Sequence, residues 1–198
     1  MQTYNGVKPD IRFLNDVKEV LYDQKWAKQA PNFELYYMYR GVKKKNGLRY
    51  DITIIPPKML GQEFVKTKGH GHSAKYGEVY IVLKGQAFYL MQKYVGHKID
   101  DVCAVKAKKG DAVIIPPHYG HITINPSKNK ELKEANWLCE DCQNVYDLFI
   151  EKQGACYYFT REGWIKNEKY GKVPKLRFEK ALKALPKNLG FLKYGKNK

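Results

Sequence analysis

The chain lacks any long apolar run, and this absence limits where it can reside. No stretch of about 18 apolar residues occurs among its 198 residues, so the sequence predicts no membrane-spanning helix. Its first residues, MQTYNGVKPDIRFLND, also lack the apolar core of a secretion signal. We therefore expect a cytoplasmic protein that does not bind a membrane.

Cysteine is scarce as well. The four cysteines are Cys103, Cys139, Cys142 and Cys156. CEDC, residues 139–142, has the spacing of half a zinc site, but no second Cys or His pair of matching spacing follows it. We therefore expect four free thiols, as is usual in a reducing compartment.

Acidic residues are few compared with basic ones, 20 against 36, and the net charge is +16. This balance suits a nucleic-acid surface, a positive cleft for small anionic substrates, or lysines spread over solvated faces. The lysines are scattered, with a denser tail over 180–198, and no zinc-finger, RNA-recognition or helix-turn-helix motif accompanies them. Charge alone names no partner, and we do not expect nucleic acid.

Aromatic residues, in contrast, are abundant, with 16 Tyr within a hydrophobic content of 43%. From about residue 33 the hydrophobic pattern has a period of two, and FELYYMYRGV and LRYDITII flank KKKNG, whose Asn-Gly predicts a hairpin. Further predicted strands are EFVKTKGHGH, EVYIVLKG, AFYLMQKYV, AVKAKKGDAVIIP, HITIN, ANWLCE, VYDLFIE and ACYYFT. About ten short strands with no helix between them predict an antiparallel all-β sandwich or barrel.

Two appendages flank these strands. Residues 15–30 predict a helix that is capped by Asn15 or Asp16 and ends before a proline. KLRFEKALKAL, residues 175–185, predicts a second, short helix. We expect a single domain with a helical extension over 1–32, a barrel over 33–160 and a basic extension over 161–198.

KTKGHGHSAKYGEVY, residues 66–80, holds two of only five histidines. Residues two apart on a strand point to the same face, so His70 and His72 project side by side, and Glu78 shares a face with Tyr80. His121 begins another alternating stretch, HITIN. Three imidazoles and a carboxylate, without thiolate, suit Fe(II), Mn(II), Ni(II) or Zn(II) and leave positions open for a ligand.

A simpler interpretation stands beside this one. An H-x-H pair is weak alone, and Glu78 can form a surface ion pair with a nearby lysine. His97 and His118 have no companion residues, so we expect them in turns or on the surface.

These stretches resemble the two motifs of the cupins, small β-barrels with metal ligands inside. H-G-H, five residues, Glu78, six residues and Gly85 resemble the first motif. GDAVIIPPHYGHITIN resembles the second, with its inner glycine displaced. The resemblance implies an all-β cupin fold, a double-stranded β-helix or jelly-roll barrel, with an N-terminal helix and a basic C-terminal extension.

The block GQEFVKTKGHGHSAKYGEVYIVLKG, with the second motif behind it, is similar to the archaeal cupin-type phosphoglucose isomerases over about residues 34–160. That family carries T-K-G-H-x-H, a later E-V-Y and a P-P-x-x-x-H turn. The similarity implies an aldose–ketose isomerase of glycolysis and gluconeogenesis, acting on glucose 6-phosphate with one divalent ion per subunit, Fe2+ first. It implies metal ligands His70, His72, Glu78 and His121, substrate-binding residues Tyr36, Thr53, Thr67 and Gly69, and Tyr80 in the pocket wall. The chemistry of the isomerisation makes Glu78 and Tyr80 the candidate catalytic residues.

The chain also departs from that family. The interval before Glu78 is shorter, and WLCEDCQNVY, residues 137–146, replaces a Tyr-Pro and a downstream His that close the family's pocket. A cupin metalloenzyme acting on another sugar phosphate or as an Fe(II) oxygenase therefore stays open as an alternative. The basic tail leaves open a second alternative, a non-catalytic sugar or nucleic-acid binding module. The sequence also leaves open whether Glu78 carries a proton or a hydride shifts without a base. Exposed barrel edges favour a homodimer.

Overall fold

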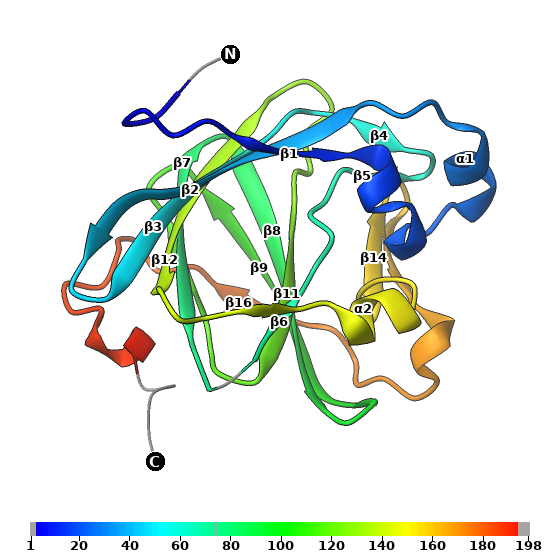
Figure 1. Cartoon of the computed structure of the whole chain (residues 1–198). Helices are drawn as coiled ribbons and strands as arrows, with labels where there is room; N and C mark the ends of the chain where they lie inside the picture. The colour runs from blue at the N-terminus through cyan, green and yellow to red at the C-terminus, as the bar shows by residue number, and fades with distance from the viewer. Residues whose placement is uncertain (1–2, 74, 194–198) are drawn as a thin grey trace.

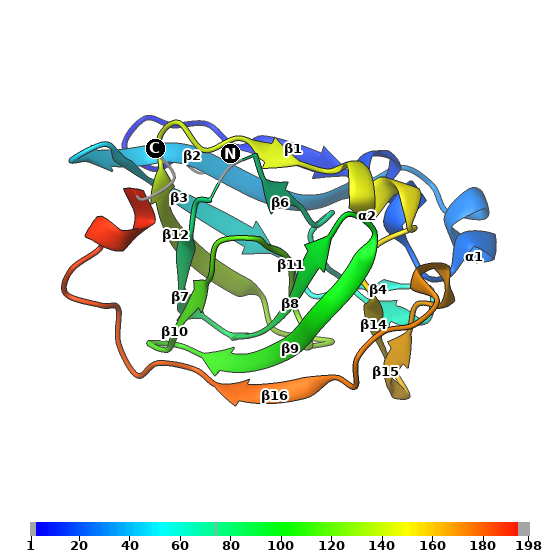
Figure 2. The same ribbon diagram turned by 90° about the horizontal axis from the view of Figure 1, so that it is seen from below.

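Two facing β-sheets form a barrel in the computed structural model, which describes residues 3–73 and 75–193 (Figure 1). The larger sheet runs in the order β1 (Asp10–Phe13), β2 (Glu34–Lys45), β3 (Leu48–Ile55), β12 (Leu132–Cys139), β7 (Glu78–Lys84) and β10 (Ala112–Ile115). The facing sheet runs in the order β11 (Tyr119–Ile124), β8 (Gln86–Val95), β9 (Lys98–Lys108) and β16 (Arg177–Lys180). Figure 2 looks into the barrel, with β2 and β3 on one side and β8 and β9 on the other.

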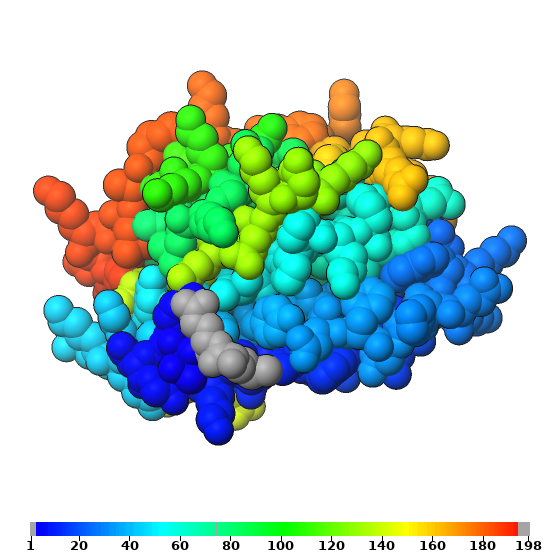
Figure 3. Space-filling view, turned by 90° about the horizontal axis from the view of Figure 1, so that it is seen from above, coloured from blue at the N-terminus to red at the C-terminus, as the bar shows by residue number. Residues whose placement is uncertain are grey.

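Strands that are distant in sequence pair within these sheets. β12 lies between β3 and β7, and β11 pairs with β8 rather than with β10 beside it in the chain. In the space-filling view of Figure 3, the blue-to-cyan early strands lie against the yellow-green part of the chain that contains β12. Strands that return between earlier ones are typical of a jelly roll. The predicted all-β barrel of the jelly-roll type is confirmed.

Smaller sheets complete the fold. One contains β15 (Gly163–Lys166), β14 (Tyr157–Thr160), β5 (Glu63–Phe64) and β4 (Met59–Leu60), and another pairs β13 (Asn144–Val145) with β6 (Gly71–His72). The predicted hairpin is present, because Asn46 and Gly47, with φ of 53° and 71°, join β2 to β3. The stretch predicted over 104–116 divides into the end of β9 and β10.

The segment over 65–72 closes the barrel beside β11. The Thr67 N–H donates to the Thr123 carbonyl at 2.9 Å, and His70 and His121 exchange backbone hydrogen bonds of 3.2 and 2.9 Å. This backbone pairing brings the H-x-H stretch next to the third histidine, although about 50 residues separate them in the sequence.

A buried ion pair ties the N-terminal segment to the barrel. The Lys66 ammonium contacts the Glu63 carboxylate, and both side chains are almost fully buried. Glu63 also accepts a hydrogen bond of 2.6 Å from the Tyr22 N–H, and Lys66 lies 4.9 Å from the ring centroid of Tyr158. Each charge is therefore compensated within the protein, as a buried charge requires.

The helix predicted over 15–30 is wrong for most of its length. The structure has three short helices there: η1 (Leu14–Asp16), η2 (Lys18–Val20) and α1 (Gln24–Gln29). Leu14, Val17 and Val20 are buried at intervals of three residues. That interval matches the three residues per turn of a 3₁₀ helix rather than the 3.6 of an α-helix.

The short helix predicted over 175–185 is also wrong. Residues 177–180 form β16, which runs parallel to β9 at the edge of the facing sheet. The Arg177 guanidinium donates to both carboxylate oxygens of Asp101 on β9, at 2.8 and 2.6 Å. The free backbone groups at the edge of β9 and this bidentate pair give the segment partners that a helix there lacks.

The predicted strand VYDLFIE is replaced by the helix α2 (Asp147–Glu151). Its Leu148 and Phe149 are buried, and the Phe149 ring fills the space beside Gly69 and Gly120. All four cysteines are buried free thiols. No helix within residues 3–73 and 75–193 has the length and apolar character needed to cross a membrane.

Candidate metal centre

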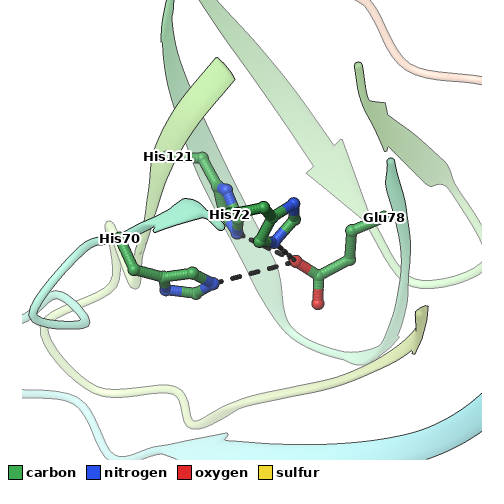
Figure 4. A group of neighbouring side chains, drawn as sticks. All are labelled: His70, His72, Glu78 and His121. Carbon is green, nitrogen blue, oxygen red and sulfur yellow. Dashed lines mark ion pairs between the residues drawn. The ribbon is translucent and has the colours of Figure 1, made fainter. Parts of the chain in front are cut away.

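Three imidazoles and one carboxylate converge on a single point inside the barrel (Figure 4). Glu78 Oε2 lies 3.2 Å from His121 Nε2, 3.3 Å from His72 Nε2 and 3.9 Å from His70 Nε2. One donor atom from each of the four residues lies within 4.8 Å of the others. The sequence-predicted ligand set is therefore brought together by the fold.

The elements of the barrel explain this convergence. His72 lies in β6, and His121 in β11 is bridged to His70 in the preceding segment. Glu78 begins β7 on the opposite wall, where it pairs with Leu138 of β12. The site therefore spans the space between the two sheets.

The four side chains fit a divalent cation. His72 Nε2 and Glu78 Oε2 are buried and have no hydrogen-bond partner among the described residues. With ligand bonds of about 2.1 Å, neighbouring donor atoms around an ion lie about 3.0–3.4 Å apart. The Glu78 distances to His72 and His121 fall in that range. His72 Nδ1 lies 3.0 Å from the Tyr76 carbonyl, a contact that orients its Nε2 toward the cluster.

Charge in the site is distributed unevenly. Burial opposes ionisation of Glu78, but His121 and His72 outweigh it and hold the Glu78 pKa well below its usual value. Burial and the neighbouring His121 lower the pKa of His70, and burial lowers the pKa of His121. Burial also disfavours a charged His72, yet Cys142 and Glu78 raise its pKa to about 10. The cluster thus combines an ionised carboxylate with two neutral imidazoles.

A cavity open to solvent lies beside the cluster. Among the residues that line it are Tyr36, Thr53, Thr67, Gly69, His70, Glu78 and Tyr80. These side chains come from both walls of the barrel. The structure therefore places every residue predicted for substrate binding next to the candidate metal ligands.

The predicted polar side chains differ in the contacts that their hydroxyl groups already make. The Tyr36 hydroxyl accepts a hydrogen bond from the Lys68 N–H at 3.2 Å, and Thr67 Oγ1 accepts one from the Thr123 N–H at 3.0 Å. In both cases the hydroxyl proton remains available to a ligand. The Tyr80 hydroxyl lies 3.1 Å from His121 Nε2, so it contacts one of the candidate metal ligands.

Position 69, a glycine, has no space for a side chain. Its φ is +86°, and an added Cβ would lie 2.5 Å from Ile122 Cγ2 and 2.6 Å from Phe149 Cδ1. A residue with a side chain is strained in this conformation and also collides with its neighbours. The backbone can therefore approach the cavity closely here.

The sequence predictions missed a second buried carboxyl group in the cavity. Glu134 is 1% exposed, and its Oε2 accepts a hydrogen bond of 2.6 Å from the Tyr89 hydroxyl. Burial raises the pKa of Glu134 to about 8. The only sequence signal was the alternation of Glu134 and Asn136 with Ala135 and Trp137 in β12, whose inward face depends on strand register.

Other cavity residues were missed too. They are Arg12 on β1, Met38 and Arg40 on β2, Arg49 and Asp51 on β3, Lys68 in the segment over 65–72, Asn136 and Leu138 on β12, Asn144 on β13, and Tyr146 just after it. Asn144 and Tyr146 come from the segment over 137–146 that departs from the family pattern. That segment thus forms part of the pocket wall.

The two remaining histidines lie away from the cluster. His118 is exposed in a turn with φ of 69°, and His97 is exposed and lies 3.1 Å from Glu151. Their expected turn or surface positions are confirmed.

Comparison with known proteins gives a consistent result. Residues 12–175 match the family described as glucose-6-phosphate isomerase (GPI). The glucose-6-phosphate isomerase of Pyrococcus abyssi (strain GE5 / Orsay) is 34% identical over 126 residues, which cover 61% of this chain and 65% of that protein. The isomerase of Pyrococcus horikoshii is 31% identical over 167 residues, which cover 81% of this chain and 86% of that protein. The first match thus spans just under two thirds of the relative's own length.

More distant similarities occur among solved structures. A structure of oxalate oxidase superposes with a TM-score of 0.45 and 13% identity, over 56% of this chain and 54% of that one. The oxalate decarboxylase of Lactobacillus farciminis gives 0.42 and 18%, over 53% and 29%.

Proposed function

Since the chain belongs to the glucose-6-phosphate isomerase family, we propose that it interconverts glucose 6-phosphate and fructose 6-phosphate in a metal-dependent reaction. The observation that carries this proposal is the convergence of three imidazoles and one carboxylate beside a polar cavity. Such an isomerisation builds negative charge on a carbonyl oxygen while the adjacent C–H bond breaks. A divalent ion, with Fe2+ as first candidate and Mn2+, Ni2+ or Zn2+ as alternatives, supplies Lewis-acid stabilisation of that charge when bound.

In this proposal Glu78 and Tyr80 act on the reacting carbons and their oxygens. Glu78 is ionised and lines the cavity, so it is placed to carry a proton between neighbouring carbons. Burial raises the pKa of Tyr80 well above its ordinary value. Tyr80 therefore keeps its hydroxyl proton at neutral pH and can donate it in a hydrogen bond to a sugar oxygen.

Other residues that line the cavity are proposed to hold the phosphate group of the sugar. Thr53 and Thr67 supply hydroxyl groups, Gly69 allows close backbone approach, and Tyr36 adds a third hydroxyl. Arg12 lines the same space, and its guanidinium makes no hydrogen bond or ion pair within the part of the chain that the structure describes. An unpaired cation in a cavity attracts a dianionic phosphate.

A coupled assay of fructose 6-phosphate conversion tests this function. We expect turnover to vanish after chelator treatment and to return with at least one of Fe2+, Mn2+, Ni2+ and Zn2+. Glu78→Gln should keep the far-UV circular dichroism spectrum and lose turnover, whereas His118→Ala, at an exposed turn, should keep both. The absence of turnover with all four ions contradicts the proposal.

A second candidate is an isomerase that acts on a different sugar phosphate. It is favoured by the additional polar groups of Asp51, Glu134 and Asn136 in the cavity and by the changed segment over 137–146. Assaying the metal-loaded protein with a panel of aldose phosphates of four to six carbons separates the two candidates by their kcat/KM.

We also propose a homodimer in the cytoplasm. β16 is an edge strand whose four residues are all exposed, with Phe178 62% exposed, so it offers an edge to a second subunit. The four free thiols suit a reducing compartment. Light scattering of the purified protein measures the subunit number.

A further inference from the structure

The two carboxylate oxygens of Glu78 have different environments. Oε2 faces the three histidines at 3.2 to 3.9 Å. Oε1 points away from them and accepts a hydrogen bond from Asn136 Nδ2 at 2.5 Å. One oxygen of the carboxylate thus faces the candidate metal position, and the other accepts a hydrogen bond from Asn136, a residue that the sequence analysis did not single out.

The fold holds this amide firmly. Asn136 is 5% exposed and lies in the middle of β12, where it pairs with Asp51 on one side and Tyr80 on the other. Asp51 does not compete for the amide donor, because its Oδ1 accepts from the Gly41 N–H and its Oδ2 from Arg49. The Asn136 donor is therefore directed at Glu78.

The orientation matters because an aldose–ketose substrate presents two adjacent oxygens. Three imidazoles and one carboxylate oxygen would occupy four of the six positions of an octahedral ion and would leave two free. A carboxylate that turns to bind through both oxygens occupies a further position and leaves one. A group that holds Oε1 away from the ion thus preserves the site for a two-oxygen ligand.

We propose that Asn136 is a positioning residue that makes Glu78 a single-oxygen metal ligand and keeps two coordination positions open for the sugar. The inference rests on the metal-dependent function proposed above. It adds a specific role for a residue outside the ligand set. Hydrogen-bond partners of metal ligands commonly change metal affinity or activity by 10- to 100-fold when they are replaced.

Co2+ is a suitable probe, because its visible absorption reports the ligand set and geometry of the ion. Asn136→Leu has nearly the shape of asparagine but no donor, so Oε1 is free to turn toward the ion. We expect the visible bands of the Co2+-loaded variant to differ in position and intensity from those of the Co2+-loaded wild type, because Oε1 would then replace a solvent molecule at one of the open positions. We also expect KM for the sugar phosphate to rise about tenfold or more.

Two further variants make the result decisive. Asn136→Ala removes the same donor without adding bulk and serves if Asn136→Leu does not fold. Asn167→Ala is the matched control, because Asn167 is also buried, at 3% exposed. Its side-chain amide donates hydrogen bonds to the carbonyl groups of Lys152 and Ala155 and not to Glu78. The control should lose stability but keep the wild-type cobalt spectrum.

The cobalt spectrum decides the question without any sugar. An unchanged spectrum in the folded Asn136 variant overturns the proposal, even if KM rises. A changed spectrum supports it, even if the wild type proves inactive on glucose 6-phosphate. Failure of the proposed reaction and failure of this inference are thus distinguishable.

Discussion

The buried carboxyl group of Glu134 makes the stability of the protein depend on pH in a measurable way. Its side chain is 1% exposed and hydrogen-bonded to Tyr89, and burial raises its pKa from an ordinary 4.5 to about 8. The folded protein therefore keeps this proton at neutral pH, whereas the unfolded chain releases it. Replacing Glu134 by glutamine removes the titration and leaves a carbonyl oxygen for the Tyr89 hydroxyl.

The sign and magnitude follow from proton linkage. Between pH 4.5 and pH 8 the unfolded chain binds one proton fewer, so the free energy of unfolding falls by about 1.4 kcal/mol per pH unit. Over the whole interval the loss is about 5 kcal/mol, and between pH 5.5 and 7.5 it is about 3 kcal/mol. The stabilisation that protonated Glu134 contributes is complete below the pKa of this group in the unfolded chain. It is lost as the pH rises through the pKa of the same group in the folded protein.

Urea unfolding followed by circular dichroism at pH 5.5, 6.5 and 7.5 measures this effect. The wild type and Glu134→Gln share their other titrating groups, so the difference between their unfolding free energies isolates Glu134. We expect that difference to shift in favour of the variant by about 1.4 kcal/mol per pH unit. Glu162→Gln, in the exposed β14–β15 turn, controls for the loss of one acid. If the pH profiles of wild type and Glu134→Gln are parallel, Glu134 does not hold its proton in the fold.

Three further predictions concern the metal site and the barrel. His72→Ala should lose the bound metal ion while His118→Ala retains it, as judged by metal analysis after dialysis; equal metal content in both would contradict the ligand assignment. Lys66→Met should destabilise the fold by about 3–5 kcal/mol, and the double change with Glu63→Leu by less, because only the single change leaves a buried charge unpaired. Gly69→Ala should weaken sugar-phosphate binding, measured by calorimetry, because the added Cβ meets Ile122 and strains a backbone with φ of +86°; unchanged affinity would show that this backbone does not approach the ligand.

The barrel was predictable from sequence where local chemistry decides the structure. The Asn46-Gly47 turn adopts the positive φ values that its residues favour, and period-two alternation marks the long central strands. The prediction failed where tertiary contacts decide which secondary structure a segment forms. Val17 and Val20 fit an α-helical stripe as well as a 3₁₀ spacing, and Arg177 enters a strand because Asp101 lies on the neighbouring edge.

For the candidate site, too, the sequence identified some residues and missed others. His70, His72, Glu78 and His121 carry strong patterns and distinctive spacing, so the sequence pointed to them. Glu134 and Asn136 carry no motif, and their importance follows from the pairing of β12 with β3 and β7. A shift of one residue in that pairing would turn both side chains out of the cavity. Such residues are recognised only when the register is known.

Metal content and isomerase turnover, measured together on one purified sample, test the central claim most directly. We predict one divalent ion per chain, loss of fructose 6-phosphate turnover in proportion to the ion removed by chelator, and recovery in proportion to the ion restored. A protein that binds no divalent ion, or that turns over sugar phosphate equally well without one, would contradict the account.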